Sequence, residues 1–169
     1  TTLADQDLER LVSELMLEMS WDFSGWFTGF TLWQEDMRQR TEYMKDCMYV
    51  AAKKGREDKP DDGINALVDR FAEKYKNHKY KFVRVWGEPR GHDKNATGWS
   101  FYQMVEHRLK HHDWHIDVAV TTAVSDGHEN RYEVINQFFG EKDPLLPKIR
   151  INEDTCKDVI ISIHNTERT

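Results

Sequence analysis

The chain has 169 residues, of which 38% are hydrophobic and 32% are charged, and its formal net charge is −6. This composition excludes a disordered chain, the length favours one domain over residues 1–169, and no apolar run approaches the roughly 20 residues of a membrane span. The negative charge argues against a domain that binds DNA by non-specific affinity alone.

The first part of the chain predicts one helix followed by three strands. Leucine and valine residues at helical spacing indicate an amphipathic helix over residues 4–15. A strand is expected to end near Asp22, and aromatic and β-branched residues indicate two further strands over residues 26–34 and 43–51. Because the connections are too short for a crossover helix, these strands should form an antiparallel meander.

The rest of the chain predicts alternating helices and strands. A polar segment with two glycines and a proline, residues 53–63, is the clearest predicted loop. After it, the expected elements are a helix (64–75), a strand (82–86), a loop (87–98), a helix (99–110), a strand (115–120), a helix ended by Gly140 (130–139), a strand (148–151) and a last helix capped by Asn152 or Asp154 (154–164). This order predicts an α/β fold with a mixed sheet and helices on both faces.

Two acidic residues come directly after predicted strands. Asp22 follows the first strand, and Glu88 follows the strand over residues 82–86. Neighbouring strands lie about 4.8 Å apart, so carboxylates at their ends can converge on one divalent cation. Mg²⁺ prefers oxygen ligands and needs few from the protein when substrate phosphates supply the rest. The pair therefore predicts metal-dependent phosphodiester cleavage. The competing interpretation is that both are ordinary turn residues, since Asp favours turns for local reasons.

Four cations are candidate phosphate contacts: Arg84, Arg90, Lys94 and Arg131. Arg90 is the strongest of these, because it neighbours Glu88 in a loop that carries two glycines. The alternative for each is a surface salt bridge, which contributes little to stability. Asp93, in the same loop, is a candidate to support the metal ligands, and its other interpretation is a solvated loop residue.

Histidines and cysteines favour structural explanations. Zinc usually needs four convergent nitrogen or sulfur ligands, and the four clustered histidines straddle a predicted helix-to-strand junction, so we expect them not to point together. They are His107, His111, His112 and His115. The two cysteines, Cys47 and Cys156, lie far apart in the sequence without a CxxC motif, which is typical of a reduced intracellular protein.

Three segments together resemble one protein family. Residues 19–34 contain Asp22 in Ser-Trp-Asp-Phe-Ser, residues 85–91 contain Glu88 in Trp-Gly-Glu-Pro-Arg-Gly, and residues 131–156 begin with Arg131 and end with a cysteine. In order and spacing, over residues 16–165, they resemble the C-terminal nuclease domain of the large terminase subunit of tailed bacteriophages.

The resemblance implies a ribonuclease-H-like fold and a metal-dependent endonuclease that cleaves double-stranded viral DNA during genome packaging. It implies Mg²⁺ or Mn²⁺, as one or two ions, with Asp22 anchoring the metal and Glu88 holding a second position. The implied partners are double-stranded DNA, the terminase ATPase domain of the full-length protein, the small terminase subunit and the portal. The implied location is the cytoplasm of the infected bacterial host.

The chain departs from the family pattern in two places. Glu88 stands where Asp is commoner, and the family's third catalytic Asp belongs to a segment that would follow Thr169, so we expect this nuclease domain to lack its C-terminal segment. The absence of a G-x-x-x-x-G-K-[ST] motif also predicts no ATPase domain. Two alternatives remain open: another ribonuclease-H-like enzyme of the resolvase or recombinase type, and a catalytically inactive docking module.

Overall fold

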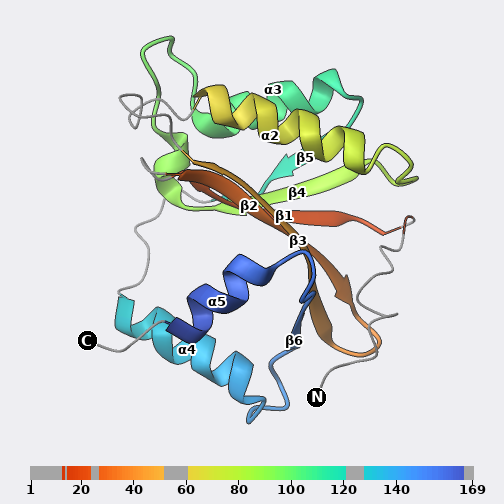
Figure 1. Cartoon of the computed structure of the whole chain (residues 1–169), viewed down its shortest axis with the longest axis vertical. Coiled ribbons are helices and arrows are strands. Elements are labelled where there is room, and N and C mark those ends of the chain that lie inside the picture. The colour runs from red at the N-terminus through yellow and green to blue at the C-terminus, as the bar shows by residue number, and fades with distance from the viewer. Residues whose placement is uncertain (1–12, 14, 24–26, 52–60, 121–127, 166–169) are drawn as a thin grey trace. The chain divides into compact units, whose positions relative to one another are not determined.

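The structure is a computed structural model that describes residues 13, 15–23, 27–51, 61–120 and 128–165. Its strands are β1 (Leu17–Phe23), β2 (Phe27–Asp36), β3 (Thr41–Ala51), β4 (Phe82–Gly87), β5 (His115–Val118) and β6 (Lys148–Ile151). Its helices are α2 (Asp61–Lys74), the 3₁₀ helix η1 (Pro89–His92), α3 (Phe101–His111), α4 (His128–Gly140) and α5 (Lys157–Asn165) (Figure 1).

The six strands form one mixed sheet in the order β5-β4-β1-β2-β3-β6. The first three strands make an antiparallel meander, while β4 pairs with β1, β5 with β4, and β6 with β3 in parallel. The predicted α/β class with a mixed sheet is thus confirmed, and the arrangement is consistent with a ribonuclease-H-like fold.

The chain divides into two compact units, which are described separately. Among the described residues, unit 1 contains 32–47 and 128–165, and unit 2 contains 13, 15–23, 27–31, 48–51 and 61–120. The long strands β2 and β3 contribute residues to both units, whereas β1, β4, β5, α2 and α3 belong to unit 2.

The core of unit 2 forms where two strands meet two helices. Alternate residues of β1 and β4 are buried, and α2 and α3 lie side by side against these strands (Figure 1). Residues three and four apart on each helix supply the other side of this core: Ile64, Leu67, Val68 and Phe71 of α2, and Tyr102, Val105 and Leu109 of α3. Each such aliphatic or aromatic side chain stabilises the fold by roughly 1.5–3 kcal/mol. Since side chains alternate across a strand, burial of Trp21 directs Asp22 to the opposite face.

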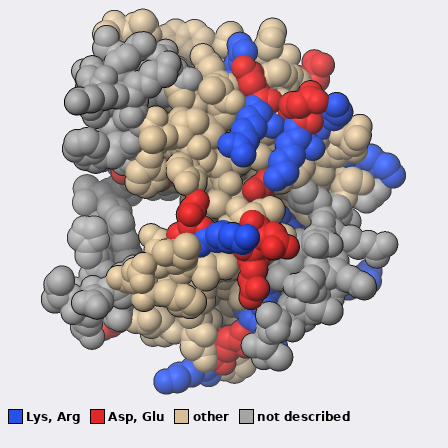
Figure 2. Space-filling view, in the orientation of Figure 1, with Lys and Arg blue, Asp and Glu red and all other residues tan. Residues whose placement is uncertain are grey.

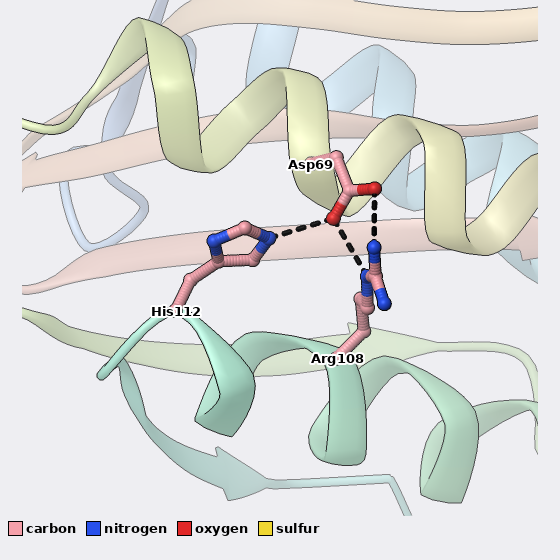
Figure 3. Close-up of polar contacts among 3 residues, drawn as sticks. All are labelled: Asp69, Arg108 and His112. Carbon is pink, nitrogen blue, oxygen red and sulfur yellow. Dashed lines mark hydrogen bonds and ion pairs between the residues drawn. The ribbon is translucent and has the colours of Figure 1, made fainter.

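A charged cluster joins the two helices of unit 2 (Figure 3). Asp69 of α2 accepts two hydrogen bonds from Arg108 of α3, at 2.6 Å from Nε and 2.7 Å from Nη2. The ring of His112, just after α3, lies 2.6 Å from the same carboxylate. Two-point Arg–carboxylate pairs fix geometry as well as charge, so this cluster sets the register of α2 against α3.

The cluster predicts a loss of stability in acid. Hydrogen bonds from Arg108 lower the pKa of Asp69 to about 2, with a further contribution from His112, against partial burial. Because the folded pKa lies below the unfolded one, the stabilisation is present above about pH 4 and disappears as the pH falls towards 2. Because the pair is partly exposed to solvent, we expect the cluster to add about 1 kcal/mol to the free energy of unfolding at neutral pH.

An Asp69→Asn variant measures this contribution. At neutral pH its unfolding temperature should be about 3 °C lower than that of the unchanged chain, and the difference should vanish near pH 2. The control is Glu73→Gln, which removes an exposed ion pair between this residue of the same helix and Lys76, two residues after the helix ends. Thermal unfolding followed by circular dichroism decides the matter, and a constant difference from pH 2 to 7 would contradict the assignment.

Unit 1 brings the two cysteines together. Residues 41–44 of β3 pair with residues 148–151 of β6, which places the segment after β6 beside the end of β3. Cys47 Sγ then donates to the carbonyl of Thr155 at 3.2 Å, and Thr155 Oγ1 donates to the carbonyl of Lys45 at 2.7 Å. Burial raises the pKa of Cys156 to about 12, so this thiol stays protonated at neutral pH.

Several predicted boundaries were wrong for local reasons. Helix α2 begins at Asp61, inside the predicted loop, and β5 ends two residues early, at Val118. Helix α3 begins after Ser100, which forms a reciprocal capping box with Gln103. Helix α5 begins three residues late, because the Asn152 side chain accepts hydrogen bonds from the main chain of the next turn. The predicted helix over residues 4–15 lies almost entirely outside the described residues.

Candidate metal and phosphate site

The parallel pairing of β1 with β4 places Asp22 beside Glu88. The paired residues run from Leu17 with Val83 to Trp21 with Gly87, so Asp22 and Glu88 are the next two residues in the same register. The two strands are parallel, and both residues therefore lie at the carboxyl ends of β1 and β4. This is the edge where ligands gather in α/β proteins.

The carboxylate of Glu88 turns towards β1. Its Oε1 lies 3.4 Å from the backbone nitrogen of Phe23, the residue after Asp22, in a long hydrogen bond that the amide donates. Glu88 also precedes η1, but its side chain makes no capping hydrogen bond to that helix. The carboxylate is thus held against the end of β1 and keeps lone pairs for another partner.

The negative charge of Glu88 affects the pKa of Asp22. The pKa of Asp22 is raised, first by partial burial and then by the negative charge of Glu88. The neighbouring negative charge disfavours the ionised form of Asp22, and a bound cation would remove that cost. A pair of hard oxygen donors with unrelieved negative charge fits Mg²⁺ or Mn²⁺ in chemistry.

The loop after β4 packs closely against Tyr102 of α3. The buried Tyr102 hydroxyl donates to the carbonyl of Glu88 at 2.7 Å. A Cβ on Gly87, whose φ is +156°, would lie 2.5 Å from that hydroxyl and 2.6 Å from the carbonyl oxygen of Trp21. A Cβ on Gly91 would collide with the Tyr102 ring. Glycine at both positions therefore lets the Glu88 backbone close onto α3.

Phe23 completes the support from the strand side. Its ring meets Tyr102 edge-on at 5.3 Å between centroids and stacks on Trp21 at 5.4 Å. The residues on either side of Asp22 are thus packed against each other, and Phe23 is also packed against α3. The sequence analysis did not identify Tyr102, because its role depends on a contact with a residue 14 positions away. The local pattern indicates only that Tyr102 lies on the buried face of α3.

The two loop cations of the prediction follow Glu88 within six residues in the chain. Arg90 is the second residue of η1, and Lys94 forms an isolated bridge with Ser100; both side chains are exposed. Within the described residues neither cation makes an ion pair, so both remain available to phosphate groups. Asp93 is exposed and its carboxylate has no hydrogen bond to another described residue, which favours its interpretation as a solvated loop residue.

Two other predicted cations are placed differently. Arg84 forms a salt bridge with Asp117 of β5 at 2.9 Å, the alternative considered for every candidate cation. Arg131 lies in α4, which belongs to unit 1, whereas Asp22 and Glu88 belong to unit 2. Among the described residues, no group of three or more His, Cys, Asp or Glu side chains forms a metal site, and the histidines at 107, 111, 112 and 115 make none.

The chain matches no model of a known protein family, and no curated protein is similar enough to count as a match. No helix within the described residues is long and apolar enough to cross a membrane.

Proposed function

We propose that the chain is a divalent-metal-dependent DNA endonuclease, the nuclease part of a phage packaging enzyme that acts in the cytoplasm of the infected host. The observation that carries the proposal is the placement of Asp22 and Glu88 at adjacent ends of parallel strands, with the pKa of Asp22 raised by the neighbouring charge. The resemblance of the surrounding segments to the large terminase subunit adds the substrate, double-stranded DNA, and the partners named with it.

The chain's own residues have separate tasks in this mechanism. Asp22 and Glu88 supply the oxygen ligands, and Tyr102 fixes the Glu88 main chain so that its carboxylate stays against β1. Arg90 and Lys94 contact phosphate groups of the bound DNA strand. When bound, Mg²⁺ or Mn²⁺ supplies Lewis acidity for attack of water on the scissile phosphodiester.

Metal dependence tests the proposal. The purified chain should bind Mn²⁺ weakly, because two carboxylates leave most of the coordination positions to water, and it should nick supercoiled plasmid slowly in Mn²⁺ but not in EDTA. Calorimetry gives the binding, and agarose electrophoresis gives the nicking rate. A chain that neither binds millimolar Mn²⁺ nor nicks plasmid would contradict the proposal and favour a docking role.

Binding to intact duplex DNA should be weak, with a shallow dependence on salt. The net charge is −6, and on the face in Figure 2 the described Lys and Arg side chains are interspersed with Asp and Glu rather than gathered in a band. A protein that neutralises few phosphates releases few counterions. We expect a slope of log K against log salt of about −2 for a duplex in EDTA, measured by fluorescence anisotropy, and tight binding at physiological salt would refute this expectation.

A further inference from the structure

The loop between Glu88 and α3 ends in an exposed tryptophan that is held rigidly. Asn95 Oδ1 accepts hydrogen bonds from the backbone nitrogens of Thr97 and Trp99, at 2.9 and 3.1 Å, and from Thr97 Oγ1 at 2.6 Å. The main chain adds a hydrogen bond from the Asn95 nitrogen to the Trp99 carbonyl at 2.8 Å. Four hydrogen bonds thus fix the turn from which the indole projects.

The indole of Trp99 is braced from one side and open on another. The His107 ring of α3 meets it edge-on, with 5.1 Å between centroids and 83° between planes. Even so, 43% of Trp99 is exposed to solvent. An aromatic ring kept at the surface by a rigid turn is already in position for a ligand and loses little entropy on binding.

A hollow of about 190 Å³ lies against this ring. Its wall consists of Asn65 from α2, Met104 and His107 from α3, and Asn95, Thr97 and Trp99 from the loop. Asn95 is occupied by the turn, but the Asn65 amide and the His107 ring make no hydrogen bond to other described residues. The hollow therefore offers an aromatic surface together with polar groups in its wall.

The same loop carries cationic side chains without partners. Arg90 and Lys94 are exposed and make no ion pair with other described residues. An exposed aromatic ring that shares one loop with two exposed cations matches the chemistry of a nucleotide, whose base stacks on aromatic rings and whose phosphate attracts cations. Bases inside a duplex are already stacked on their neighbours, so the base that enters must be unpaired.

We propose that this hollow, the Trp99 pocket, binds one unpaired nucleobase of a DNA strand whose phosphates lie on Arg90 and Lys94. The inference rests on the proposed nuclease function and narrows it: the enzyme engages a locally opened or single strand beside the acidic pair. The pocket and Glu88 share one short loop, so binding of the base positions the adjoining backbone for cleavage.

Anisotropy of a fluorescein-labelled oligo(dT) of about ten nucleotides tests the pocket, in EDTA so that no cleavage occurs. Trp99→Ala should weaken binding roughly tenfold, since stacking of one base on an aromatic ring has about that effect. Trp99→Phe should retain most of the affinity. The matched control is Trp86→Ala, since Trp86 of β4 is exposed to nearly the same degree, 42%, but does not line the hollow.

Three outcomes overturn the pocket: no binding of oligo(dT) by the unchanged chain, equal binding by Trp99→Ala, or equal losses in Trp99→Ala and Trp86→Ala. Circular dichroism confirms that each variant is folded, and Trp99→Phe distinguishes a lost ring from a disturbed loop. Failure of the nuclease proposal is separate. If oligo(dT) binding depends on Trp99 but the chain does not nick DNA in Mn²⁺, the pocket proposal is supported and the nuclease proposal is contradicted.

Discussion

Replacing Asp22 with Asn should lower plasmid nicking in Mn²⁺ by roughly 100-fold or more. Loss of a residue that merely orients a metal ligand already costs 10- to 100-fold, and Asp22 is assigned as a ligand itself. The amide keeps the shape of the side chain but loses the negative charge that attracts the cation. Calorimetric Mn²⁺ binding should disappear together with the activity.

The same variant should be as stable as the unchanged chain or slightly more stable. Partial burial and the charge of Glu88 both raise the pKa of Asp22, so the ionised carboxylate opposes folding near neutral pH. Asn removes that charge, and the unfolding temperature should hold or rise by about 2 °C. If the variant lost activity because it unfolds, its unfolding temperature would fall instead. The unfolding temperature therefore distinguishes loss of a metal ligand from loss of the fold.

Asp93→Asn is the matched control for charge. Asp93 lies five residues after Glu88, is exposed, and has no hydrogen bond from its carboxylate to another described residue. This variant changes the net charge by the same amount and should nick DNA at close to the unchanged rate. If Asp22→Asn cuts as fast as Asp93→Asn, the assignment of Asp22 is wrong.

Local patterns predicted the elements that carry the acidic pair. Strand β4 is the predicted strand over residues 82–86 with one residue added, and β6 covers residues 148–151 as predicted. Alternating burial along a strand and the turn after it depend on neighbours in the sequence, so periodicity finds them. The positions of Asp22 and Glu88 at strand ends follow from the same patterns.

Contacts between distant segments were beyond such patterns. The hydrogen bond from Tyr102 to Glu88, the ion pair of Arg108 with Asp69, and the meeting of Cys47 with the residue before Cys156 all depend on how elements pack. The start of α5 also differs from the periodicity. The Asn152 side chain accepts hydrogen bonds from the following turn, and α5 begins only after that turn. Sequence spacing gives the candidates, and packing decides which of them meet.

Replacing Gly87 with Ala should disturb both the fold and the acidic pair. The new Cβ would lie 2.6 Å from a backbone oxygen of β1, at Trp21, and 2.5 Å from the Tyr102 hydroxyl. Neither atom can retreat freely, since one belongs to a sheet and the other donates to Glu88. Strain at positive φ and overpacking together should cost about 3 kcal/mol, an unfolding temperature lower by about 10 °C.

Gly98→Ala separates the two contributions to that cost. Gly98 also has a positive φ, +86°, but a Cβ there would meet nothing within 4 Å. It should therefore lose only the conformational part, about 1 kcal/mol, or about 3 °C. Mn²⁺ binding measured below both unfolding temperatures then isolates the site: Gly87→Ala must shift Glu88 away from β1 and weaken binding, while Gly98→Ala leaves it unchanged. Equal unfolding temperatures for the two variants would show that the Glu88 loop is not closed onto Tyr102, and the geometry assigned to the acidic pair would fall with it.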